Sequence, residues 1–313
     1  MTGDEGVSVD GRTVVPVEHS TRRGIGWLVL AGLCWGTSGT LGTLLRRESG
    51  VGFLSVASLR ILVGGLALIL VVSALGRLRL PSTAGTWGQI ALLGLASGAY
   101  QVGFFLGVGT IGVPLATMVA IGSTPVMVAI VDVLTHRVRL RWPLFLSCLL
   151  ALVGLALLVG APDSRDTTAL TLGVIGSLVA GAGFASISLL GTRLRPDFDA
   201  VTGTGVAFLL GGLLVSVVAV FAPGDEPLLP HEWTPAAIVW VVALGVVPTA
   251  VAYLSYLRGL RTQTGTVGSL VSLLEPVTAA VVAFFVLGQR LTPVGLVGMV
   301  VLLAAVAVGS LVK

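Results

Sequence analysis

Two ionisable side chains, Arg60 and Glu275, lie far inside long apolar runs of this sequence. A charge held in hydrocarbon is costly, so it is usually retained for a substrate or ion pathway or for a fixed structural partner. The guanidinium of Arg60 offers a two-pronged donor that suits a carboxylate. The carboxyl of Glu275 can serve as a proton carrier or as the counter-charge of an amine. The two residues therefore predict a site for a small charged molecule or for protons.

Structural roles compete with these functional ones and stay open at this point. Arg60 can pair with backbone carbonyls or extend its head group toward the membrane surface. Glu275 can be a neutral carboxyl hydrogen-bonded to a neighbouring helix, or it can be permanently ionised opposite Arg60. Neither interpretation requires a substrate.

The other candidate site residues are polar or polar-tipped side chains within the same apolar runs. Aromatic belts at membrane borders are routine, but Trp35 and Tyr100 lie mid-run, where a belt does not explain them. Hydroxyl side chains in spans more often bond within their own helix, which makes the serines and threonines weaker candidates. The set consists of Trp35, Thr37, Ser38, Tyr100, Gln101, Thr124, Ser186, Tyr253 and Tyr256.

The composition indicates a polytopic helical membrane protein. The chain is 55% hydrophobic and 10% charged, with a mean hydropathy of +1.04, whereas soluble domains carry about 25% charged residues. No charged residue occurs from Leu80 to Val131, and a helix needs roughly 20 residues to span a bilayer, so this stretch holds two spans. The net charge of +4 comes from basic residues scattered near the ends of the runs, so no nucleic-acid partner is expected.

Ten apolar runs predict ten transmembrane helices. They cover about 24–44, 53–75, 87–108, 113–134, 142–160, 169–190, 203–221, 235–257, 265–287 and 291–312. With the N-terminus inside, the inner segments hold thirteen Lys and Arg residues and the outer segments four, and Arg60 completes the total of 18. This bias places both termini in the cytoplasm. Residues 1–23 are polar and predicted to be a disordered tail.

The two halves of the chain align at an offset of 151 residues. Pro125 matches Pro276, and Arg139-Leu140 matches Arg290-Leu291. We therefore predict two repeats, residues 24–160 and 169–312, each with five spans; because five is odd, the repeats have opposite orientation. Inverted repeats are common in secondary transporters, whose sites lie mid-membrane between the halves. The paired prolines remove helix hydrogen bonds and predict hinges, with a tolerated kink as the alternative.

Several motifs resemble the EamA family of the drug/metabolite transporter superfamily over about residues 24–312. They are Cys34-Trp35-Gly36-Thr37-Ser38, Ser58-Leu59-Arg60-Ile61-Leu62, the segment from Ala250 to Tyr256, and Leu273-Leu274-Glu275-Pro276-Val277. Gln289 and Arg137-Val138 depart from the Gly-Glu-Arg-Leu that is common in the family. The resemblance implies a ten-helix basket whose central cavity is lined mainly by spans one, three, four, six, eight and nine. It also implies export of amino acids or similar small metabolites.

Other classes of protein find less support in the sequence. The three histidines lie outside the runs and no H-E-x-x-H or G-x-S-x-G occurs, so an enzyme, a metal site and a cofactor are not expected. A facilitative carrier or drug-efflux permease of the same fold, and a non-transporting scaffold, remain alternatives. We expect a multi-pass protein of the bacterial cytoplasmic membrane. Its expected partners are lipid and a small-molecule substrate, with the proton as a candidate coupling ion. The sequence leaves its oligomeric state open.

Overall fold

The computed structural model is helical throughout its apolar runs. It describes residues 8–9, 12–13, 17–139, 141–159, 167–221, 227, 229–230, 232–288 and 292–311. Within these ranges eight helices are long and apolar enough to cross a membrane, and Trp142–Leu158 and Pro293–Gly309 are two shorter apolar helices. A backbone in hydrocarbon must satisfy its own N–H and C=O groups, which explains why the runs are helices. The predicted all-α membrane fold with ten helices is confirmed.

The first half holds five spans. Its helices are α1 (Val17–Gly36), α2 (Ser38–Ser49), α3 (Phe53–Ala74), α4 (Ala84–Leu134) and α5 (Trp142–Val159). The first span consists of α1 and α2, whereas α4 contains two spans separated by a break at Gly112, whose φ of 78° favours glycine. Helix α1 begins inside the predicted tail, and the two-residue strands β1 (Ser8–Val9) and β2 (Arg12–Thr13) pair antiparallel. The rest of the tail lies outside the described residues.

The second half contains two interrupted spans. Its helices are α6 (Thr167–Gly191), α7 (Ala200–Phe221), α8 (Pro235–Gly245), α9 (Ala252–Leu260), α10 (Gly265–Val271), α11 (Leu274–Leu287) and α12 (Pro293–Gly309). A π-helical segment, η1 (Val246–Val251), joins α8 to α9. It contains Pro248, which cannot donate a backbone hydrogen bond, and such wide turns are frequent at functional sites. The second interruption separates α10 from α11.

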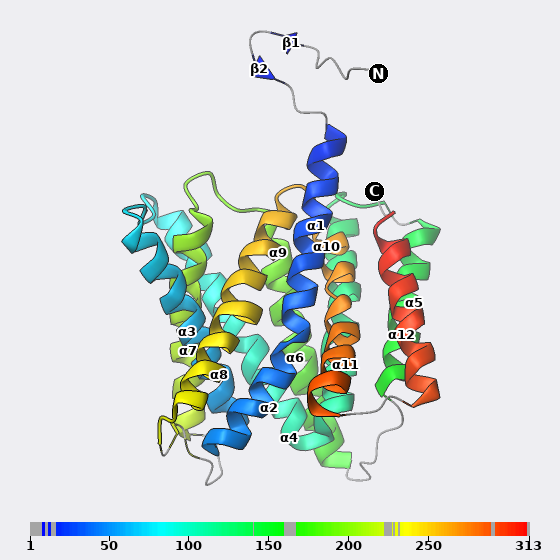
Figure 1. Ribbon diagram of the computed structural model, residues 1–313. Coiled ribbons are helices and arrows are strands. Elements are labelled where there is room, and N and C mark those ends of the chain that lie inside the picture. The colour runs from blue at the N-terminus through cyan, green and yellow to red at the C-terminus, as the bar shows by residue number, and fades with distance from the viewer. Residues whose placement is uncertain are drawn as a thin grey trace, which may run out of the picture.

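The helices of the two halves pack against each other rather than as separate bundles. Helix α3 packs on α7, α4 on α6 and α7, α5 on α12, and α1 on α9 and α11. Figure 1 shows that α1 begins and α12 ends on the same side of the molecule, which we call the terminal side. The core therefore lies between the halves, where the sequence predicts the site.

The inverted repeat is visible in two matching helix starts. Thr83 caps α4 and Thr234 caps α8, and the two residues are 151 positions apart, the offset found in the sequence. Each hydroxyl also donates to a carboxylate of the other half: Thr83 to Asp197 at 2.9 Å, and Thr234 to Glu48 at 2.7 Å. Because α4 begins on the terminal side and α8 on the opposite side, a capping threonine bonds a carboxylate once on each side, although the two carboxylates are not related by the offset.

Candidate functional site

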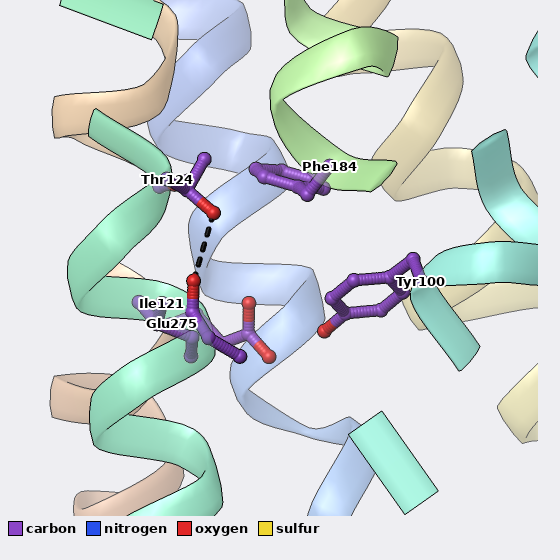
Figure 2. Close-up of a pocket in the computed structure, with 7 residues that line it drawn as sticks. Tyr100, Ile121, Thr124, Phe184 and Glu275 are labelled. Carbon is purple, nitrogen blue, oxygen red and sulfur yellow. Dashed lines mark hydrogen bonds between the residues drawn. The ribbon is translucent and has the colours of Figure 1, made fainter. Parts of the chain in front are cut away.

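A small pocket lies between the two halves. It is lined by Tyr100, Ala120, Ile121, Thr124, Phe184, Ser272 and Glu275. Figure 2 shows the Glu275 carboxylate turned toward the Tyr100 hydroxyl. Two pairs of lining residues, Ile121 with Ser272 and Thr124 with Glu275, are related by the offset of 151. The pocket therefore lies on the pseudo-symmetry axis and contains three of the predicted site residues, Tyr100, Thr124 and Glu275.

Pro276 explains the helix break that carries Glu275 into the pocket. A proline has no N–H, so Pro276 cannot donate to the carbonyl of Ser272 four residues earlier. That carbonyl accepts instead from the Glu275 N–H at 2.9 Å, a tighter turn between α10 and α11. Pro125 likewise cannot donate to the carbonyl of Ile121, although α4 continues through it as helix. Both residues that lose a proline's hydrogen bond line the pocket.

Arg60 lies close to the pocket but is held by hydroxyl groups. Its Nη1 donates to Ser38 Oγ at 2.8 Å, and its Nε donates to Thr249 Oγ1 at 3.4 Å. It interacts electrostatically with Glu275, Tyr100 and Tyr253. In the part of the chain that the structure describes, neither Arg60 nor Glu275 forms an ion pair. The guanidinium and the carboxyl group thus lie in one site without pairing with each other.

The π-helical segment η1 places one of the groups that hold Arg60. The Thr249 hydroxyl donates to the Leu244 carbonyl at 3.0 Å, five residues earlier, while it accepts from the guanidinium. Thr249 is fully buried. The turn around Pro248 therefore orients a hydroxyl toward α3, a contribution that sequence analysis missed because a π-helical turn leaves no periodic signature.

An aromatic cluster packs beside the pocket. The Trp35 ring contacts the rings of Phe184, Tyr253 and Tyr256, with centroids 5.3, 5.1 and 5.0 Å away. All four rings are buried, and Tyr253 and Tyr256 belong to α9, which ends on the terminal side. The Tyr256 hydroxyl forms a hydrogen bond of 2.6 Å with Ser188 Oγ. Trp35, Tyr253 and Tyr256 thus pack behind the pocket, and Phe184 links the cluster to it.

The remaining predicted residues lie outside the pocket lining. Thr37 donates to the Cys34 carbonyl at 2.7 Å and Ser186 to the Ala182 carbonyl at 2.8 Å, so both hydroxyls bond locally. Gln101 is buried beside Tyr100 on α4. Ser38 contacts Arg60 rather than the pocket.

Asp132 is a buried charge that sequence analysis missed. It lies near the terminal-side end of α4, where a position close to a span end indicates contact with water, yet it is fully buried. Its Oδ2 accepts from the backbone N–H of Thr266 at 2.9 Å and from the Thr266 hydroxyl at 2.8 Å. The sequence places Asp132 only close to a span end, so its full burial was not predicted. The free N–H groups at the start of α10, which need an acceptor, were the available signal.

Comparisons with known proteins agree with this architecture. The model of the EamA-like transporter family matches residues 22–160 and 171–311. The uncharacterized transporter YwfM of Bacillus subtilis is 28% identical over 91% of this chain and 92% of its own length. The threonine/homoserine exporter RhtA of Escherichia coli is 29% identical over 82% of this chain and 81% of its own.

A solved crystal structure shares the fold. It superposes with a TM-score of 0.75 over 94% of this chain and 98% of its own, at 18% identity. The family model covers both halves, each with the five spans and the pocket residues described above. This chain is a multi-pass membrane protein that belongs to the EamA-like transporter family.

Proposed function

We propose that this transporter exports a small zwitterionic metabolite of the amino-acid class by alternating access. The observation that carries the proposal is the pair of opposite charges at one site, the Glu275 carboxylate in the pocket and the Arg60 guanidinium beside it. A ligand with an amine and a carboxylate matches both groups. The export of threonine and homoserine by the relative RhtA supports the same class of substrate.

The charged groups at the site favour a polar substrate over a hydrophobic drug, since hydrophobic drugs would leave them without partners. A drug-efflux permease is thus the less favoured alternative.

The packed aromatic cluster beside the pocket supports a carrier rather than a channel. The rings of Trp35, Phe184, Tyr253 and Tyr256 contact one another, and Tyr253 and Tyr256 belong to α9, which ends on the terminal side. A channel needs a continuous path, but a carrier alternates between two closed ends. We infer that the two halves rock around the pocket, with the prolines Pro125 and Pro276 as hinges.

The charge distribution supports a cytoplasmic terminal side in the bacterial inner membrane. The positive-inside bias assigns this side to the cytoplasm. Reporter fusions after Arg77, Arg139 and Arg195 should then read cytoplasmic, and a fusion after Asp225 should read external. A cytoplasmic signal after Asp225 would contradict the topology. Arg165 and Arg290, which count among the basic residues of the outer segments, and the fusion site Asp225 lie outside the described residues.

A counterflow experiment tests the proposed substrate class. The full chain is reconstituted into proteoliposomes loaded with one unlabelled amino acid, and entry of the labelled amino acid is measured across a panel. We expect counterflow with a subset of small zwitterionic amino acids and none with monovalent amines or carboxylates of similar size. If a hydrophobic cationic drug gives counterflow and no amino acid does, the proposal is wrong. If no solute of the panel gives counterflow, the result would support the alternative of a non-transporting scaffold protein.

A further inference from the structure

The contact between Asp132 and Thr266 has no counterpart on the opposite side of the molecule. The offset of 151 relates Asp132 to Ala283 and Thr266 to Leu115. Neither alanine nor leucine can form a side-chain hydrogen bond. By contrast, the contacts of Thr83 with Asp197 and of Thr234 with Glu48 occur on both sides. The repeat is therefore symmetric in its capping threonines and asymmetric in this one buried contact.

The asymmetric contact joins the two halves at the start of α10. Asp132 belongs to the first half and Thr266 to the second, and both are fully buried. The first N–H groups of a helix have no partner within it, so the carboxylate satisfies a group that would otherwise be orphaned. Gly265 permits the close approach, because a Cβ there would lie 3.0 Å from Val128 and 3.4 Å from Asp132 Oδ2.

The same contact leaves one carboxylate oxygen without a partner. Among the described residues, no group donates a hydrogen bond to the buried Oδ1 of Asp132. An unsatisfied buried acceptor destabilises the arrangement that buries it, whereas water would satisfy it if the terminal side opened. The contact therefore combines two strong hydrogen bonds with one unsatisfied acceptor that destabilises it. Such a balance is expected of a contact that must break when the terminal side opens.

The start of α10 is connected to the pocket through a polar stripe. Ser269 donates to the Thr266 carbonyl at 3.0 Å, and Ser272 donates to the Ser269 carbonyl at 2.7 Å. Ser272 lines the pocket, and its carbonyl accepts from the Glu275 N–H. A chain of hydrogen bonds thus runs from Thr266 along α10 to the turn before Glu275.

We propose that Asp132 is a positioning residue that latches the terminal side of the pocket shut through Thr266. Because Ala283 and Leu115 provide no equivalent latch, the resting transporter is closed on the terminal side and opens there only when the contact breaks. This inference rests on the alternating access of the proposed function.

One cysteine reporter in the pocket tests the latch from both sides. The free cysteines Cys34 and Cys148 are replaced by alanine, and the lining residue Ile121 is changed to cysteine in the full chain. A membrane-impermeant maleimide is then applied to vesicles of each orientation. In the otherwise wild-type protein we expect fast labelling from the opposite side and slow labelling from the terminal side.

Asp132→Ala should change the two rates in opposite directions. Loss of two hydrogen bonds to a charged group predicts a terminal-side rate about tenfold higher, together with a lower rate from the opposite side. Asp132→Asn retains an oxygen that can accept both bonds and should label as the wild type does. Thr266→Ser should also match the wild type, whereas Thr266→Val, which keeps only the backbone donor, should give a smaller shift than Asp132→Ala.

Each outcome separates the latch from the proposed function. Equal labelling of the wild-type reporter from both sides would contradict alternating access itself. One-sided labelling that Asp132→Ala leaves unchanged, or raises from both sides together, would overturn the latch and leave transport standing. If the alanine variant does not reach the membrane, the comparison of Thr266→Val with Thr266→Ser decides, because equal rates for these two would also overturn the latch.

Discussion

Helices α10 and α11 are two parts of one span, yet their surroundings are opposite. All seven residues of α10 are buried. In α11 only Pro276 and Val277 are buried, and Phe285 is 79% exposed. The break between them lies at Ser272, beside the pocket. The difference indicates that the terminal-side part of the span is surrounded by protein while the other part faces lipid, with the site at the junction.

The chemistry of the two parts follows the same division. The side chain of α10 that meets the other half by hydrogen bonding is Thr266, which contacts Asp132. Helix α11 begins with the residue pair Leu274 and Glu275 and continues with an almost entirely apolar sequence. Helix α10 therefore holds the span against the first half, and the first turn of α11 presents the side chain that would contact the substrate.

The largest effect is expected at the junction, from Glu275→Gln. The variant keeps the shape and hydrogen bonding of the side chain but removes its charge. Transport should fall by roughly 100-fold, because loss of the carboxylate that would pair with the substrate amine costs about 2–5 kcal/mol. If Glu275 also carries protons, the residual activity should lose its pH dependence. Counterflow measured at several pH values checks both effects, with Glu48→Gln on the opposite side as the control.

Transport by Glu275→Gln at the wild-type rate and with unchanged pH dependence would remove Glu275 from the mechanism. The junction would then be a structural break only. The carboxyl would be a hydrogen-bonded side chain in the core, as one interpretation of the sequence allowed.

A smaller effect should separate α10, the part surrounded by protein, from α11, the part that faces lipid. Leu270 of α10 is fully buried and packs against Ala151, Leu155 and Leu302. Leu270→Ala should lower the free energy of unfolding by about 2 kcal/mol, the low end for a buried leucine because the unfolded helices still lie in an apolar medium. Phe285→Ala, in the exposed part, should change it by less than about 0.5 kcal/mol. Unfolding in detergent micelles measures both.

Equal destabilisation by these two substitutions would contradict the division of the span. A larger effect of Phe285→Ala would suggest that α11 packs against a partner surface on its exposed face.

The smallest effect concerns Asp197, which lies in the connection between α6 and α7. The hydrogen bond from the Thr86 hydroxyl, helped by those from Thr83 and Ser82, lowers the pKa of Asp197. Because the pKa is lower in the folded protein, the stabilisation is complete above the unfolded value of about 4 and is lost as the pH falls through the folded value. The melting temperature should therefore decrease slightly more between pH 6 and about pH 3 for the wild type than for Asp197→Asn. An identical decrease in both proteins would show that this contact adds nothing on the terminal side.

Much of the fold could be predicted because hydrocarbon imposes strong constraints. The apolar runs, the offset of 151 and the two prolines identified ten helices and the place where Glu275, Thr124 and Tyr100 meet. These features depend on local sequence and on the repeat.

Features that depend on packing between distant helices were not accessible. The burial of Asp132 results from the start of α10, which lies 134 positions away in sequence. The local hydrogen bonds of Thr37 and Ser186, by contrast, follow the general tendency of hydroxyl side chains in spans to bond within their own helix. The role of Thr249 depends on the π-helical turn around Pro248.

Binding to purified protein tests the central claim, that Arg60 and Glu275 together recognise a zwitterion. The ligand is the amino acid with the strongest counterflow, compared by titration calorimetry with its methyl ester, which lacks the carboxylate, and its N-acetyl derivative, which lacks the amine. We predict that the wild type binds each derivative at least about tenfold more weakly than the parent amino acid. Arg60→Gln should bind the ester as tightly as the parent amino acid while still binding the N-acetyl derivative more weakly. An ester that binds the wild type as tightly as the parent amino acid would contradict the account.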